Sequence, residues 1–193
     1  MAIEFYSPNK LKTGGALFVT AQVEDQAVYF NLIQQTDWND ETKKGSFIDG
    51  QRLNLKLSPD EMCEVIRAAR AKGNWKFYHT NDGDPTTGSF NYYQSKDDAG
   101  KVTREGYGLT VNRGKLQIKI GFNLGSALRL ALFMETVLKA IFQKDMADEA
   151  TKRAEYYKKK NQEKAKTPPP KVEAPVEQAV PEPPAEEDGS EVF

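Results

Sequence analysis

Two segments of this chain, residues 45–57 and 108–120, align without a gap at an offset of 63 positions. In the second part of each segment, residues 52–57 and 115–120, polar and apolar side chains alternate strictly. Alternation with a period of two is typical of a strand that has one buried and one solvated face. An internal repeat predicts two copies of one structural unit, and this limits the possible folds more than any other feature.

The residues before the first of these strands predict the rest of the unit. Residues 15–24 and 27–35 are rich in β-branched and aromatic side chains, and the polar break between them predicts a hairpin. We expect two further strands at about 44–49 and 51–57, separated by the turn pair Asp49-Gly50. The unit therefore begins with four strands.

A helix is expected directly after the fourth strand. Ser58 can cap it, Pro59 fits the first helical position, and Glu61 completes a capping box. Gly73 ends this helix near residue 72. The second half has the same plan, with a helix from about 123 after strands at about 74–80, 87–95, 105–112 and 115–121. The predicted fold class is α+β, with two ββββα repeats that form antiparallel sheets packed against helices.

The second helix, over residues 123–143, is apolar around most of its circumference. A sheet face covers only one stripe of a helix, so we expect this helix either to lie at the centre of the domain or to form a subunit interface, and we expect a homo-oligomer joined through it. Residues 144–166 are polar and lysine-rich, and they predict a helical extension outside the core. The chain is thus divided into a domain of residues 1–143, the extension, and a tail of residues 167–193.

The tail holds seven of the ten prolines, together with seven acidic residues and one lysine. Its charge is −6 and the whole chain carries −1, which leaves residues 1–166 at +5. Because the tail has few apolar residues to offset its ordering entropy, we expect it to be disordered. A basic body with an acidic tail indicates interaction with nucleic acid.

The alternation also predicts a solvated sheet face that carries rings and cations. Bases of a single strand stack on rings, and cations contact its phosphates, so such a face suits single-stranded nucleic acid. The alternative is that β-propensity alone explains the rings and that the lysines are ordinary solvated residues. The candidate binding residues are Tyr29, Phe47, Arg52, Lys56, Trp75, Lys76, Tyr78, Tyr92, Tyr93, Lys115 and Lys119.

The sequence offers little for catalysis or metal binding. His79 is the only histidine and Cys63 the only cysteine, so a histidine triad or a zinc cluster would rest on single residues. Loops 81–85 and 97–100 are composed as turns and lack the downstream carboxylate of a calcium loop. We expect no enzyme activity, no cofactor and no metal. No apolar run is long enough to span a bilayer, so we expect no membrane contact. A single cysteine excludes an internal disulfide framework and fits a cytoplasmic location.

The repeated plan of four strands and a helix, with residues 53–61 leading from strand to helix, resembles one superfamily of nucleic-acid-binding proteins. It contains the plant Whirly proteins, the Pur-alpha proteins and the positive-cofactor transcription coactivators. The resemblance covers about residues 14–143. It implies that single-stranded nucleic acid binds on the sheets and that helices pair in dimers or tetramers.

The end of the tail is similar to the tails of single-strand-binding proteins of bacteria and their phages. This second resemblance implies that the tail recruits replication or recombination proteins. The residues that carry it are Glu186, Glu187, Asp188, Glu191, Val192 and Phe193.

Together these features predict a non-enzymatic single-stranded-DNA-binding protein of phage type, acting in replication, recombination or repair in the cytoplasm of a bacterial host. Two functional alternatives stay open. One is an RNA-binding or transcription-modulating protein of the same fold, and the other is an interaction scaffold that binds no nucleic acid. The structural rival is the OB-fold, whose five strands would not give two four-stranded halves.

Overall fold

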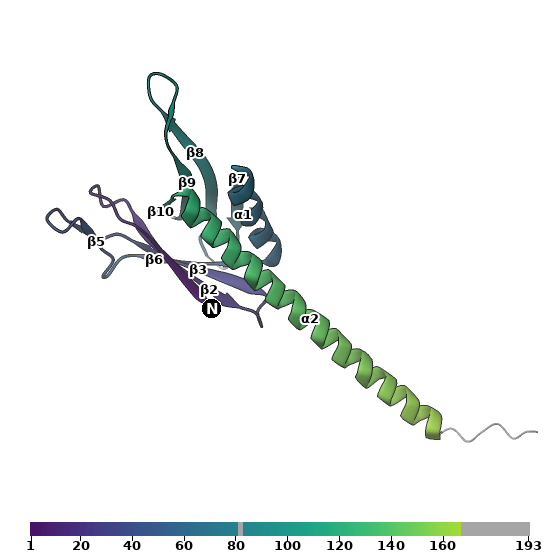
Figure 1. The fold of residues 1–193 in the computed structure, drawn as a ribbon. Helices are drawn as coiled ribbons and strands as arrows, with labels where there is room; N and C mark the ends of the chain where they lie inside the picture. Colours follow the sequence, from purple (N-terminus) through teal and green to yellow (C-terminus); the bar gives the residue numbers. More distant parts are fainter. Residues whose placement is uncertain (81–82, 167–193) are drawn as a thin grey trace, which may run out of the picture. The chain divides into compact units, whose positions relative to one another are not determined.

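Two four-stranded antiparallel sheets and two helices make up the fold (Figure 1). The computed structural model describes residues 1–80 and 83–166. The chain divides into two units. Met1–Thr151 holds both sheets, and the described part of Lys152–Phe193 is the last portion of the second helix.

The strands of the first sheet pair in the order β1-β2-β3-β6. A separate two-stranded hairpin, β4–β5, is inserted between β3 and β6. Their bounds are β1 (Ala2–Ser7), β2 (Gly15–Gln22), β3 (Ala27–Gln34), β4 (Asp37–Asn39), β5 (Lys44–Ser46) and β6 (Arg52–Leu57).

The strands of the second sheet pair in the order β10-β9-β8-β7. Helix α1 joins the two sheets, and helix α2 follows the last strand. The bounds are α1 (Pro59–Ala71), β7 (Asn74–His79), β8 (Thr86–Lys96), β9 (Val102–Arg113), β10 (Leu116–Phe122) and α2 (Leu124–Lys166).

The predicted alternation in β6 is confirmed. Leu53, Leu55 and Leu57 are at most 2% exposed, while the polar residues between them are exposed. Antiparallel pairing places these leucines beside apolar residues of β3, because residues directly opposite each other share a sheet face. The apolar face of the first sheet is therefore continuous, and it forms part of the core.

The strand next to β6 differs from the one that the repeat predicts. Residues 108–113 lie in β9 and pair with β10, but residues 44–46 form β5, which pairs with β4 in the separate hairpin. The neighbour of β6 is β3, and the fourth strand of the first sheet is β1, which the sequence did not predict. Each half does contain a four-stranded sheet and a helix, but the first half has six strands in all and the repeat arrangement is not confirmed.

The predicted start of α1 is confirmed by its hydrogen bonds. The Ser58 hydroxyl accepts from the backbone N–H of Glu61, and the Glu61 carboxylate accepts from the backbone N–H of Ser58. This capping box satisfies N–H groups that the first turn leaves without a helical partner. The helix ends at Ala71, and Lys72, rather than Gly73, takes the left-handed conformation with φ 50°.

Helix α1 covers the inner face of the second sheet. The buried hydroxyl of Tyr107 in β9 donates to the carbonyl oxygens of Ala68 (2.8 Å) and Ala69 (3.0 Å) near the end of the helix. The Tyr107 ring stacks on Phe90 of β8 with centroids 4.7 Å apart. Burial of the Tyr107 hydroxyl raises its pKa.

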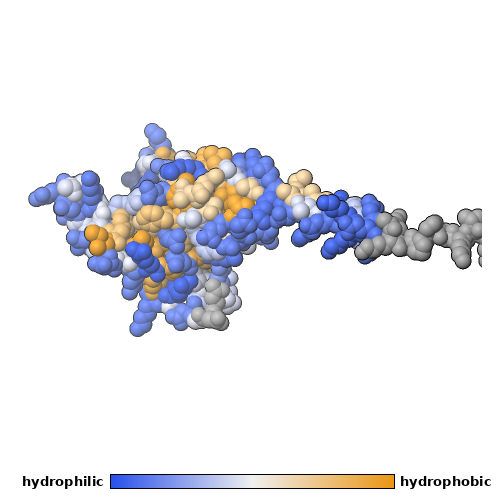
Figure 2. Space-filling view, turned by 90° about the horizontal axis from the view of Figure 1, so that it is seen from below, coloured by the Kyte–Doolittle hydropathy of each residue, from blue (hydrophilic) through white to orange (hydrophobic). Residues whose placement is uncertain are grey.

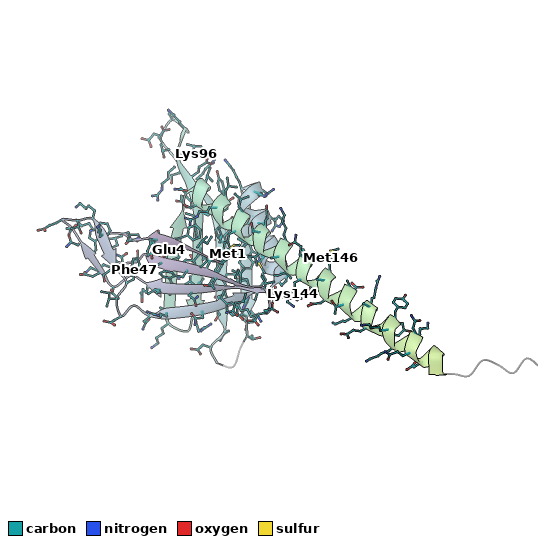
Figure 3. The ribbon with its side chains drawn as sticks, turned by 60° about the horizontal axis from the view of Figure 1, so that its bottom comes forward. Met1, Glu4, Phe47, Lys96, Lys144 and Met146 are labelled. Carbon is teal, nitrogen blue, oxygen red and sulfur yellow. The ribbon has the colours of Figure 1, made fainter. Side chains whose placement is uncertain are left out.

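One stripe of α2 completes the core of the first unit. Its buried residues recur at the spacing of a helix face and are Ala127, Leu130, Ala131, Phe133, Met134, Val137, Leu138 and Ile141. Lys144 then reaches the β2–β3 turn, where its ammonium lies 3.2 Å from the Glu24 carboxylate, and Figure 3 shows it where α2 passes the end of the first sheet. Leu128, Leu132 and Phe142 lie off the stripe and are exposed. No helix in the described part of the chain is long and apolar enough to cross a membrane.

Candidate nucleic-acid interface

The face of the first sheet that points away from the core is called here the first outer face. Antiparallel register arranges its residues in rows across β1, β2, β3 and β6. One row is Glu4, Phe18, Asn31 and Asn54. The next row is Tyr6, Ala16, Ile33 and Arg52, and the row on the other side is Ala2, Thr20, Tyr29 and Lys56. Rings, amides and cations therefore share one surface.

A groove of about 450 Å³ lies on the first outer face, lined by Phe18, Asn31, Leu32, Ile33, Arg52 and Asn54. The centroid of the Tyr6 ring lies 5.8 Å from the ring centroid of Phe18 and 5.8 Å from that of Phe47. Figure 3 shows Phe47 beyond Glu4, towards the end of the sheet away from Lys144. These three rings form an aromatic cluster beside the groove. In Figure 2 apolar residues reach the surface of the molecule between hydrophilic ones.

Charge changes sign across the first outer face. The edge strand β1 carries Glu4, whose carboxylate accepts a 2.8 Å hydrogen bond from the Tyr6 hydroxyl and raises the pKa of that hydroxyl. The opposite edge strand, β6, carries the exposed side chains of Arg52 and Lys56. The Lys56 ammonium lies 5.9 Å from the centroid of the Tyr29 ring. An anionic group is therefore favoured along β6 and disfavoured along β1.

The Tyr29 ring stands in the row of Lys56 and is partly exposed. Its hydroxyl donates to the Asp25 carboxylate at 3.0 Å, and this hydrogen bond raises the pKa of Tyr29. The hydrogen bond holds the ring at the end of the first outer face, beside the β2–β3 turn.

The corresponding face of the second sheet, called here the second outer face, is more polar. Its central row is Lys119, Thr110, Ser89 and Lys76. Both lysines are exposed, and the two hydroxyl residues lie between them. Ammonium groups and hydroxyls are common phosphate contacts. The row thus suits a sugar–phosphate backbone better than it suits bases.

Two tyrosines add rings to the second outer face. Tyr78 of β7 is 65% exposed. The ring centroid of Tyr93 of β8 lies 5.8 Å from the guanidinium of Arg104. The cross-strand partner of Tyr93 is Gly106. A Cβ at Gly106 would lie 2.2 Å from the Phe122 carbonyl oxygen and 3.0 Å from the Tyr93 hydroxyl, so only glycine fits between the neighbouring backbone and the ring.

Trp75 and Tyr92 were predicted to bind nucleic acid, and the structure corrects both. Trp75 is 7% exposed and belongs to the core. Tyr92 points to the side of α1, where its hydroxyl donates to Glu105 and the Lys72 ammonium lies 5.5 Å from its ring centroid. Neighbouring residues of a strand face opposite sides, so Trp75 cannot share a face with Lys76, nor Tyr92 with Tyr93.

Lys115 also lies away from the rows. It is exposed in the turn between Arg113 and Leu116, which are themselves cross-strand partners. The repeat predicted a strand position here because it equated Lys115 with Arg52. The other predicted residues (Tyr29, Arg52, Lys56, Lys76, Tyr78, Tyr93 and Lys119) lie on the outer faces, with Phe47 beside the first.

Two rings of the first outer face were missed. Phe18 lies on β2, whose alternation with buried Leu17 and Val19 was available in the sequence. Tyr6 lies on β1, a short strand that no neighbouring turn pair predicts. The predicted tail residues (Glu186, Glu187, Asp188, Glu191, Val192 and Phe193) lie outside the described residues.

His79 is a partner of the helix cap. Its Nε2 lies 2.5 Å from a carboxylate oxygen of Glu61, and its ring contacts Phe77. Cys63 is exposed on α1. Within residues 1–80 and 83–166, no three carboxylate, imidazole or thiol side chains come together as metal ligands would.

The fold and the two outer faces define an α+β protein with two antiparallel sheets, each with one face buried and one solvated. This fold matches that of the Whirly proteins. WHY1 from Arabidopsis thaliana is similar with a TM-score of 0.53 at 10% identity, over 80% of this chain and 92% of that chain. The plant transcriptional regulator PBF-2 is similar with a TM-score of 0.50 at 12% identity, over 78% and 87%.

A guide-RNA-binding protein complex bound to its RNA aligns less well, with a TM-score of 0.49 at 15% identity over 72% of this chain and 89% of that chain. No protein-family model matches the chain, and no curated protein matches it in sequence. At such identities the likeness to WHY1 and PBF-2 shows the fold alone. The Whirly-like part of the predicted resemblance is confirmed at that level.

Proposed function

We propose that this chain is a non-enzymatic protein that binds single-stranded DNA on its two outer faces. The observation that carries the proposal is the groove of the first outer face, which is lined by both Phe18 of β2 and exposed Arg52 of β6. The two residues stand in neighbouring rows, with β3 between their strands. Stacking of a base on an aromatic ring contributes about 1–3 kcal/mol, and it requires a base that is not already stacked in a duplex. Arg52 and Lys56 then lie on the side where the phosphates would run.

The second outer face supports the same proposal in another way. Lys76 and Lys119 stand at the two edges of one hydroxyl-bearing row. Contacts of this kind give affinity without sequence preference, because every nucleotide carries the same phosphate. The cations therefore suit any nucleic acid, whereas the rings suit a single strand.

The test is a titration of fluorescently labelled oligo-dT, the corresponding duplex and the matched RNA, followed by anisotropy. The proposal expects tighter binding of the single strand than of the duplex, and weaker binding at higher salt. Equal affinity for the single strand and the duplex would contradict it. Preference for the RNA would favour the second candidate, and no salt-dependent binding at all would favour an interaction scaffold.

The second candidate is an RNA-binding or transcription-modulating protein of the same fold. PBF-2, which shares the fold, is a plant transcriptional regulator. The rings and cations of the outer faces are compatible with either nucleic acid, since a 2′-hydroxyl can be recognised by ordinary polar groups.

The biological setting belongs to the proposal as well. The composition of residues 167–193 supports a tail that recruits replication, recombination or repair proteins, as in a phage-type single-strand-binding protein of the bacterial cytoplasm. Exposed Leu128, Leu132 and Phe142 on α2 support a homo-oligomer joined through this helix. The four-stranded sheet and the helix that each half contains support an origin by repetition of one unit.

A further inference from the structure

Two asparagines lie side by side in the groove of the first outer face. Asn31 of β3 and Asn54 of β6 are cross-strand partners, and both line the groove. Side chains directly opposite each other on one sheet face have Cβ atoms about 4.5–5.5 Å apart. The two amides are therefore close enough to contact one small ligand together.

Neither side-chain amide is engaged within the part of the chain that the structure describes. No described residue hydrogen-bonds the Asn31 or Asn54 side chain, although Asn54 uses its backbone carbonyl to accept from Arg113. The second outer face is different, since Gln117 there donates from its amide to the Asn112 amide oxygen at 2.7 Å. Asn74 and Asn91 of the second outer face are also cross-strand partners, but Asn74 accepts from the Tyr92 N–H and Asn91 donates to Ser89. Among the described residues of the two outer faces, Asn31 and Asn54 are thus the cross-strand pair of amides whose donors and acceptors are all open to a ligand.

The surroundings of the pair fit a planar heteroaromatic ligand better than an anion. Phe18 is the cross-strand partner of Asn31 on the other side, so the row runs from a ring to an amide to a second amide. Ile33 adds an apolar wall. A phosphate would lose water against the ring and the isoleucine with only Arg52 to compensate. A nucleobase can place its face on the ring and its polar edge against the amides.

We propose that Asn31 and Asn54 hydrogen-bond the Watson–Crick edge of one unstacked base that is seated on Phe18. The inference rests on the proposed function and adds how the site distinguishes a single strand from a duplex. The Watson–Crick edge of each base presents a donor beside an acceptor, and an asparagine amide presents both. Rotation of the amide by 180° exchanges the two, so the pair accepts any base.

In a duplex the Watson–Crick edges are already paired, so the same amides find no partner there. Recognition by this pair selects unpaired bases without selecting a sequence. Glu4, at the β1 end of the same row, repels phosphate and keeps the backbone towards Arg52 and Lys56.

The experiment compares oligo-dT with an oligomer of the same length built from N3-methylthymidine, which keeps the phosphates and the ring face but blocks the Watson–Crick edge. The wild-type chain is expected to bind the methylated oligomer about 5- to 30-fold more weakly, the effect of losing one or two hydrogen bonds. The double variant Asn31→Ala/Asn54→Ala is expected to bind both oligomers equally. The matched control, Asn112→Ala/Gln117→Ala on the second outer face, is expected to keep the wild-type ratio.

A second double variant, Asn31→Leu/Asn54→Leu, keeps the size of the side chains and removes only their hydrogen bonds, so it tests the same ratio if the alanine variant unfolds. Equal wild-type affinities for the two oligomers, with salt-dependent binding of oligo-dT intact, would overturn the inference and leave the proposed function standing. A ratio that persists in both asparagine variants would also overturn it. Failure of the wild type to bind any single strand would overturn the proposed function instead.

Discussion

Removing Lys76 and Lys119 together is expected to halve the salt dependence of single-strand binding. The proposal assigns phosphate contacts to four exposed strand cations, and the other two are Arg52 and Lys56. Arg104, which is also exposed on the second outer face, lies over the Tyr93 ring and is not counted among them. A cation that neutralises a phosphate of a single strand contributes about −0.7 to the slope of log K against log salt. Four such cations give a slope of about −2.8, and the Lys76→Ala/Lys119→Ala variant retains about −1.4.

These slopes predict a large difference in a simple assay. Between about 50 and 200 mM salt the affinity of the wild-type chain should fall about 50-fold, and that of the variant only about 7-fold. The measurement is anisotropy of labelled oligo-dT over a salt series. Lys139→Ala/Lys152→Ala, which removes the same charge from exposed positions of α2, is the control and should keep the wild-type slope. The reasoning is refuted if the variant with both sheet lysines removed has the wild-type slope, since phosphates then do not contact the second outer face.

Three further predictions concern rings and buried contacts. Phe18→Ala should weaken binding of oligo-dT about 5- to 150-fold, the value of one stacked base, and an altered salt slope in the same titration would contradict a stacking role. Tyr107→Phe should lower the free energy of unfolding by about 1–2 kcal/mol, because its buried hydroxyl donates to two carbonyls of α1; urea denaturation with an unchanged midpoint would oppose this. The hydrogen bonds from Lys72 and Tyr92 lower the pKa of Glu105 below its ordinary value of 4.5. The ionised carboxylate therefore stabilises the fold above about pH 4.5, and this stabilisation is lost as the pH falls through the lowered pKa. The stability difference between the wild-type chain and Glu105→Gln should therefore shrink in acid, and a constant difference across the acid range would count against the argument.

Local patterns predicted much of the second half and the start of α1. The strands expected near residues 74–80, 87–95, 105–112 and 115–121 correspond to β7 to β10. They could be predicted because the alternation and the turns depend only on residues that are neighbours in the sequence. The error at Trp75 was avoidable, since Lys76 beside it could not face the same side. The error at Lys115 came from the repeat, which treated a turn residue as a strand residue.

The sequence by itself determined the features that depend on neighbouring residues. These are the parity of β6 and β10, the capping box at Ser58, and the separation of a basic body from an acidic, proline-rich tail. Only the tertiary structure decided that β1 completes the first sheet and that β5 pairs outside it. It alone placed Asn54 beside Asn31, and Asn31 beside Phe18. The reason is that register between strands distant in sequence depends on which apolar faces pack together, and no local pattern contains that information.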